Sequence, residues 1–163
     1  MIVTLLNAHT ISDKKTKAII AIKQIMGKLQ MMTLGHFYFE VSIFLRNTIF
    51  ISSLLYGTEA LYNLSNKEIR ELERKDEELL LKILDIQFTC PRYLLYLELG
   101  LEPVSVILKK RRILFLKHIL DQNDESTSKQ IYKLQKANPS KGDWAIQVKN
   151  DLKYFEIDLS GEK

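Results

Sequence analysis

Apolar residues recur at helical spacing along most of the chain. Between residues 14 and 30, four of them share one face of a predicted helix: Ala18, Ile22, Ile25 and Leu29. After Gly35, residues 37–56 are apolar around much of the helical circumference. One side of this second segment is formed by Val41, Phe44, Leu45, Thr48, Ile51 and Leu55. The pattern predicts a helix in the centre of a bundle, and Gly57 is placed to end it in a left-handed conformation.

A third predicted helix has a distinct start and an interrupted apolar seam. Ser65 and Glu68 have the spacing of a capping box, in which each side chain satisfies a backbone amide at the helix start. The apolar seam that follows consists of Ile69, Leu72, Leu79 and Ile83. Asp76 interrupts this seam, and removing an unpaired carboxylate from water is costly. We therefore expect Asp76 either to pair with a cation such as Arg46 or to face a gap in the packing.

Four shorter helices are predicted in the second half of the chain, at residues 91–99, 103–120, 129–136 and 143–154. In the last of these, Trp144, Val148 and Leu152 form an apolar stripe. The polar stretch 121–128 is the best linker candidate. The predicted organisation is a helical bundle over residues 1–120, a linker over 121–128 and a small helical appendage over 129–163.

The predicted fold class is therefore all-α, an irregular bundle of about six or seven helices. The scarcity of glycine (6) and proline (3) supports long helices over many short strands joined by tight turns. For residues 1–10 the sequence allows an alternative to helix, a short extended stump at the N-terminus. The content of 46% hydrophobic and 27% charged residues is typical of a soluble globular protein.

The sequence also limits where the protein resides. Cys90 is the only cysteine, so no intramolecular disulfide can form, and we expect a reducing compartment, nuclear or cytoplasmic. The first ten residues lack the basic region and long apolar core of a secretory signal. The most apolar stretch, residues 37–62, carries Glu40, Arg46 and Glu59, which argues against a membrane span because charge at mid-bilayer is costly. No membrane partner is expected.

Signatures of catalysis and metal binding are missing. His9, His36 and His118 are far apart, and none has a second ligand at zinc-binding spacing. The sequence has neither a glycine-rich phosphate loop nor a G-x-S-x-G nucleophile motif. Its acids lie mainly on the helix that starts at Ser65, interleaved with bases, which is typical of a solvated face. Cys90 is interpreted as a buried structural thiol. We expect a protein without enzymatic activity, cofactor or metal.

Two basic segments are the candidate functional surfaces. The first choice consists of four consecutive cations and one that follows them: Lys109, Lys110, Arg111, Arg112 and Lys117. The second choice is Lys17 with Lys28, neighbours on the flank of the first helix. Four consecutive cations cannot all be buried, so several must be exposed, where phosphate is a natural partner. The alternative is that these cations extend into water or pair with the acidic helix, and the pattern alone supports both interpretations equally.

Three segments resemble LINE-type (non-LTR) retrotransposon reverse transcriptases. ISSLLYGTEALYNLS resembles the helix end after the palm, where the family has LLYG-x-E-x-W. KEIRELERKDEELLLKIL is similar to the charged helix that follows, and YLELGLEPVSVILKKRRILFLKHIL is similar to the next, basic segment. The likeness covers roughly residues 11–120. It implies the thumb and linker of such an enzyme, which hold the template–primer duplex, with the four cations starting at Lys109 on the linker's basic helix.

The chain also departs from this family. Leu61 stands where the family often has tryptophan, and the fingers, the palm and the Tyr-x-Asp-Asp loop with its metal-binding aspartates are missing. The leading hypothesis is a non-catalytic module that binds RNA or DNA duplex through phosphates with weak sequence selectivity. The alternative is a helical interaction or self-associating remnant with an open apolar face around Phe37, Phe39 and residues 31–32. A degraded reading frame without a selected role is the third hypothesis.

Overall fold

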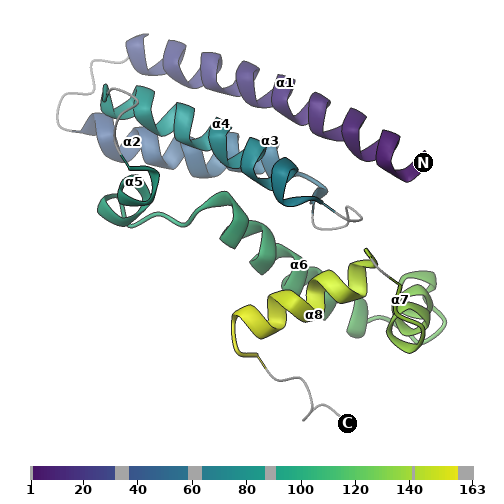
Figure 1. Cartoon of the computed structure of the whole chain (residues 1–163). Coiled ribbons are helices and arrows are strands. Elements are labelled where there is room, and N and C mark those ends of the chain that lie inside the picture. Colours follow the sequence, from purple (N-terminus) through teal and green to yellow (C-terminus); the bar gives the residue numbers. More distant parts are fainter. Residues whose placement is uncertain (1, 32–36, 59–63, 87–90, 141, 158–163) are drawn as a thin grey trace. The chain divides into compact units, whose positions relative to one another are not determined.

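The computed structural model describes residues 2–31, 37–58, 64–86, 91–140 and 142–157. This part of the chain contains seven helices and no strand, which confirms the predicted all-α class (Figure 1). The chain divides into two compact units. The first unit comprises residues 1–56 and 65–105, and the second comprises residues 57–64 and 106–163. Leu61, Cys90, residue 32 and the histidine at position 36 lie outside the described residues.

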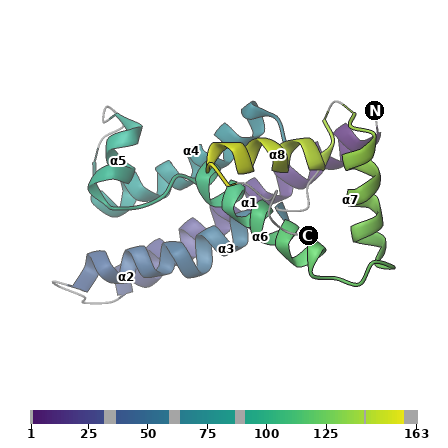
Figure 2. The same cartoon turned by 90° about the horizontal axis from the view of Figure 1, so that it is seen from below.

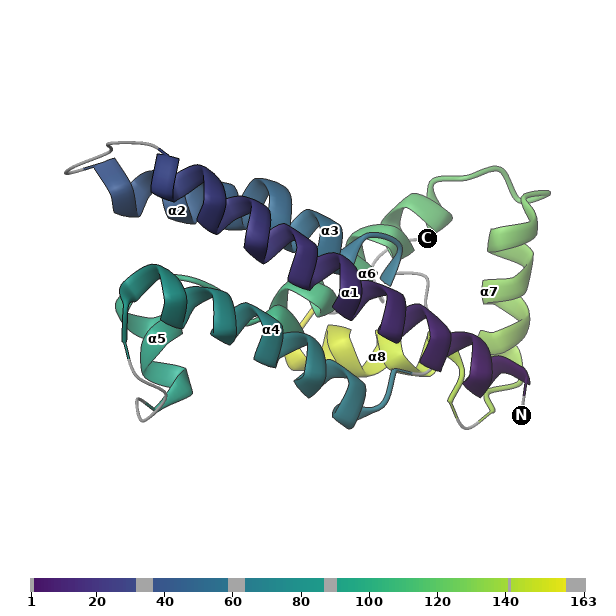
Figure 3. The same ribbon diagram turned by 90° about the horizontal axis from the view of Figure 1, so that it is seen from above.

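The first unit begins with a single long helix, α1 (Ile2–Met31). The alternative of an extended N-terminal stump is therefore wrong, because residues 2–10 continue this helix without a break. The absence of glycine and proline before Gly27 gives a physical reason, since neither helix-breaking residue interrupts the segment. Ile22, Ile25 and Leu29 are buried, as their spacing predicts. The helix packs along the second helix of the unit and along the third, which begins at Asn66 (Figure 3).

The second helix of the chain contains a turn of π-helix. It runs without a break through α2 (Tyr38–Leu45), η2 (Arg46–Phe50) and α3 (Ile51–Leu55), as Figure 2 shows. In the π turn, the Ile51 amide donates to the Arg46 carbonyl, five residues back. This wider turn changes which residues face inward, and the buried ones are Ser42, Arg46, Phe50, Ile51, Leu54 and Leu55. Gly57 follows with φ +69°, which confirms its predicted role at the helix end.

The expected central position of this helix is only partly realised. Phe44 is 63% exposed, and Thr48 and Ser52 are exposed on the same side. By length and composition, residues 38–55 are also the one helix in the described part that is apolar enough to cross a membrane, and a third of them are buried. This is weak evidence for a span, because core helices of globular proteins have the same composition. Arg46 in its middle is moreover paired with an aspartate of another helix.

Helix α4 (Asn66–Leu84) has the predicted capping box. The Glu68 amide donates to the Ser65 hydroxyl, and the Ser65 amide donates to the Glu68 carboxylate at 2.7 Å. Leu72, Leu79 and Ile83 of the seam are buried. On the outer side, Lys75 binds Glu78 at 2.8 Å, an i, i+3 pair, and this spacing brings side chains together on a helix surface.

A buried polar cluster joins three helices of the first unit. Asp76 of α4 accepts a hydrogen bond of 2.7 Å from Arg46 Nε and a second one from Nη2. Tyr96, from α5 (Arg92–Glu98), donates its hydroxyl to the same carboxylate at 3.1 Å. Burial raises the pKa of Asp76 above its usual range, and the Arg46 guanidinium and Tyr96 hydroxyl act in the opposite direction. The prediction that Asp76 pairs with Arg46 is therefore confirmed.

The second unit is built from α6 (Val104–Leu120), α7 (Thr127–Ala137) and α8 (Trp144–Tyr154). Its core cluster consists of Leu116, Ile119, Trp144 and Val148. Leu152 packs against this cluster, which confirms the predicted stripe on the last helix. The division between the units does not fall at the predicted linker, residues 121–128, but after residue 105, in the first turn of α6. The physical reason is that the second half of α6 packs against α8.

Candidate functional site

Helix α6 presents two of the predicted cations to solvent. Lys110 and Lys117 are exposed and lie on the same side of the helix, seven residues or about two turns apart. Leu114, between them on this side, is also exposed. The helix carries five lysines and arginines and no acid. Its exposed side can therefore meet an anionic partner without repulsion from an acidic residue of the same helix.

Arg112 must be removed from the predicted site. It lies on the buried side of α6, one turn from Leu108 and one turn from Leu116, and it is only 4% exposed. Its Nε and Nη2 donate to the two carboxylate oxygens of Asp151 in α8, at 2.7 and 3.0 Å. Its neighbour Arg111 is half-buried, whereas Arg112 occupies the core side. A phosphate cannot reach a guanidinium that is buried and bound in this way.

Lys109 is half-buried and takes part in packing the second unit. Its Nζ lies 3.4 Å from the centroid of the Tyr154 ring at the end of α8. A lysine ammonium over the face of a tyrosine ring is attracted by the negative charge of that face. This contact still leaves the charge of Lys109 near the surface, because Tyr154 is itself more than half exposed. Lys109 therefore remains a candidate for phosphate contact, although with a role in packing as well.

The second-choice lysines, Lys17 and Lys28, are both exposed on α1 of the first unit. Lys17 Nζ lies 2.7 Å from the Asp13 carboxylate, with both side chains about half exposed. Exposed pairs of this kind contribute little stability, so an incoming phosphate can replace the aspartate at small cost. The seven predicted residues are thus divided between the two units, with Lys17 and Lys28 in the first and the other five in the second.

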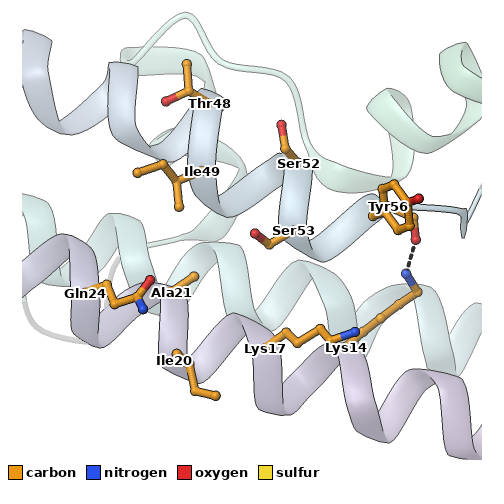
Figure 4. Close-up of a pocket in the computed structure, with 10 residues that line it drawn as sticks. All are labelled: Lys14, Lys17, Ile20, Ala21, Gln24, Thr48, Ile49, Ser52, Ser53 and Tyr56. Atoms are coloured by element: carbon orange, nitrogen blue, oxygen red, sulfur yellow. Dashed lines mark hydrogen bonds between the residues drawn. The ribbon is translucent and has the colours of Figure 1, made fainter.

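A groove in the first unit lies between α1 and the α2–η2–α3 helix (Figure 4). It has a volume of about 660 Å³ and is lined by Lys14, Lys17, Ile20, Ala21, Gln24, Thr48, Ile49, Ser52, Ser53 and Tyr56. Two of these residues are basic, five carry a hydroxyl or an amide, and none is acidic. Of these residues, only Lys17 was predicted as a site residue from the sequence. The signal that was available is the i, i+4 spacing of Thr48, Ser52 and Tyr56, which places three hydroxyls along one side of the helix.

Lys14 closes one end of this groove and has a structural role. It is buried, and its Nζ donates to the backbone carbonyl of Tyr56, as Figure 4 shows. The last carbonyls of a helix lack partners within the helix, and a cation there is favourable. The contact fixes the C-terminus of α3 to α1 through the backbone of Tyr56. The Tyr56 side chain remains 82% exposed at the mouth of the groove.

No metal site is formed by the residues that the structure describes, since no three histidine, cysteine, aspartate or glutamate side chains gather there in a suitable arrangement. The two acidic residues whose pKa is raised, Asp76 and Glu77, belong to the packed interior of the first unit. Burial raises the pKa of Glu77, which lies 3.2 Å from Arg92 Nε. This pair joins α4 to α5, so the raised pKa of Glu77 follows from its place in the packing of these two helices.

Comparison of the chain with protein-family models, with curated proteins and with solved structures gives no match. The resemblance to LINE-type reverse transcriptases therefore stays a prediction from three short segments. The candidate functional surfaces are the exposed side of α6 and the groove beside α1.

Proposed function

We propose that this chain is a non-catalytic piece of a retroelement reverse transcriptase that binds nucleic-acid duplex through phosphate contacts. The observation that carries the proposal is the exposed side of α6, where Lys110 and Lys117 lie on a helix without any acid. The two lysines are about 10 Å apart along the helix axis, which allows contacts to separate phosphates. Phosphate contacts position a protein on a duplex without selecting its sequence.

The binding should depend strongly on salt, because each neutralised phosphate releases condensed counterions. An RNA–DNA hybrid should bind at about 50 mM salt and bind much less tightly at about 200 mM. Changing Lys110 and Lys117 together to alanine should flatten the plot of log affinity against log salt by about 0.9 for each phosphate that is no longer neutralised. Fluorescence anisotropy with a labelled hybrid measures both quantities.

The matched control changes two exposed lysines of α4, Lys67 and Lys82, to alanine. It lowers the net charge by the same amount and leaves α6 intact. A slope that falls equally in both double variants would show that overall charge, not the α6 surface, determines binding. Absence of binding at low salt would contradict the proposal altogether. Nucleotide incorporation in a primer-extension assay with Mg²⁺ or Mn²⁺ would contradict its non-catalytic part.

A second function, association with itself or with another protein, is favoured by exposed aromatic residues in α2 and directly before it. Phe37 is 69% exposed, and Phe39 and Phe44 are exposed as well. Large apolar side chains that stay exposed in this number are typical of an interaction surface. Light scattering distinguishes the two functions. A monodisperse dimer that nucleic acid does not alter supports association, whereas a salt-sensitive complex with duplex supports the first proposal.

A further inference from the structure

We infer that the groove between α1 and α3 binds single-stranded nucleic acid, at a site separate from α6 in both its residues and the form of its ligand. Grooves that bind single strands combine cations, which follow the phosphate backbone, with aromatic rings, on which the bases stack. The groove provides both along the same side of the first unit (Figure 4). Its volume of 660 Å³ is within the range of about 300–1,000 Å³ typical of ligand sites.

The aromatic part of the site is Tyr56. Its ring is 82% exposed at the mouth of the groove. In this position the ring contributes no buried apolar area to the stability of the fold, so its exposure is better explained by a ligand that stacks on it. Phe44, Thr48 and Ser52 precede it at intervals of four residues and are also exposed, so one side of the helix has an aromatic ring at each end and hydroxyls between. Stacking on such rings requires unpaired bases, because a duplex hides the base faces.

The cationic part of the site is on the opposite wall. Lys17 lines the groove from α1, and Lys28 lies three turns further along the same side of that helix. The exposed contact between Lys17 and Asp13 is weak enough for a phosphate to replace it. Because no lining residue is acidic, an anionic backbone that follows this wall meets no carboxylate inside the groove.

The polar groups between the two walls are available to a ligand. The Ser52 and Ser53 hydroxyls and the Gln24 amide line the groove and make no side-chain hydrogen bond to any residue that the structure describes. Hydroxyl and amide groups can both donate and accept, so they suit the varied edges of unpaired bases. This arrangement fits binding with little sequence preference, which is the usual behaviour of single-strand sites.

The test uses the full-length chain and three labelled probes of about 12 nucleotides: oligothymidylate, oligouridylate and a duplex. Tyr56→Ala should weaken binding of the single strands at least about fivefold, the lower bound for loss of one stacked base. Tyr56→Phe should keep the affinity, because the ring remains. Lys17→Ala should reduce the salt slope by about 0.7, the value for one phosphate of a single strand. The two single-stranded probes show whether the site distinguishes DNA from RNA.

Tyr93→Ala and Lys82→Ala are the matched controls, since both residues are exposed in the same unit and lie outside the groove. The inference is overturned if Tyr56→Ala binds single strands as tightly as the parent chain, or if only changes at Lys110 and Lys117 weaken that binding. The second result would leave the proposed function of α6 standing. Loss of duplex binding in the α6 variant, with single-strand binding intact, would show two independent sites.

Discussion

The two units each bury one bidentate ion pair between an arginine and an aspartate, but in different surroundings. In the first unit, Asp76 accepts hydrogen bonds from Arg46 and Tyr96, and Arg46 also donates to the Asn47 side chain at 2.9 Å. A longer contact of 3.4 Å joins Arg46 to the carbonyl of residue 102. The pair therefore belongs to a network that joins three helices.

In the second unit, Arg112 and Asp151 bind each other through two hydrogen bonds and join only α6 to α8. Along their own helices they are flanked by the core residues Leu116 and Val148. Buried pairs offset their desolvation only when geometry and additional hydrogen bonds are good. The same chemical pair can therefore fix a whole unit through a network, or it can align just two helices.

The largest expected effect is at the centre of the network. Asp76→Ala leaves Arg46 buried without its carboxylate, and we expect the free energy of unfolding to fall by about 3–5 kcal/mol. Urea unfolding followed by circular dichroism measures this change. The double variant Arg46→Met with Asp76→Leu should recover most of the loss, because well-packed apolar residues can replace a buried pair. Glu98→Ala, an exposed acid of the same unit, is the control and should change stability by less than about 0.5 kcal/mol.

The isolated pair should give a smaller effect that is confined to the second unit. Arg112→Ala leaves Asp151 buried and unpaired, and we expect a loss of about 2–4 kcal/mol. Trp144 is the only tryptophan and lies in the core of this unit, so its fluorescence reports the second unit alone. Arg111→Ala, at the half-buried neighbour, should cost less than about 0.5 kcal/mol. If Arg112→Ala and Arg111→Ala lower the free energy of unfolding equally, the buried ion pair contributes no more to stability than the half-buried neighbour does.

Tyr96 gives the network a dependence on alkaline pH. Burial raises the pKa of Tyr96, and the nearby Asp76 and Glu77 carboxylates raise it further, so its hydroxyl ionises in the unfolded chain near pH 10 but not in the folded one. Its contribution to stability is complete below about pH 10 and is lost as the pH rises above that value. Tyr96→Phe should cost about 1 kcal/mol at pH about 7, for the lost hydrogen bond.

The difference in stability between the parent chain and Tyr96→Phe should shrink as the pH rises from about 10 to about 11. Urea unfolding at a series of pH values measures it, and the other titrating groups largely cancel in the comparison. Tyr93→Phe is the control, because this tyrosine lies in the same helix, is exposed and takes no part in the described hydrogen bonds of the network. A difference that stays constant up to pH about 11 would rule out Tyr96 as the source of the alkaline dependence.

How far the sequence predicts these features depends on how unusual each residue is in its surroundings. Asp76 interrupts an apolar seam and Arg46 interrupts an apolar helix, so their pairing is predictable from the cost of burying charge. Arg112 stands in a run of four cations, where exposure is the natural expectation. Its burial depends on the rotation of α6 against α8, which periodicity does not determine when more than half of the residues of the helix are apolar.

The helices were predictable because capping residues and apolar spacing act locally, between residues that are close in the sequence. The capping box at Ser65 and the stop at Gly57 depend on a few neighbouring residues and are confirmed. The groove was not predictable, because it requires α1 and α3 to lie side by side. The π turn that begins at Arg46 also leaves no signal in the apolar spacing, and it determines which side of the helix is left exposed.

The smallest expected effect is at Lys109, where the variants test whether this lysine acts in packing, in ligand binding or in both. Its contact with the Tyr154 ring should contribute about 0.5–1 kcal/mol, measured as the coupling in a double-mutant cycle of Lys109→Ala and Tyr154→Ala. Trp144 fluorescence in urea gives the four stabilities. If Lys109 also contacts phosphate, then Lys109→Ala should reduce the salt slope of duplex binding, whereas Tyr154→Ala should leave that slope unchanged because it keeps the charge. A coupling energy of zero, with the slope reduced by Lys109→Ala, would assign this lysine to the nucleic-acid surface and not to the packing of α6 against α8.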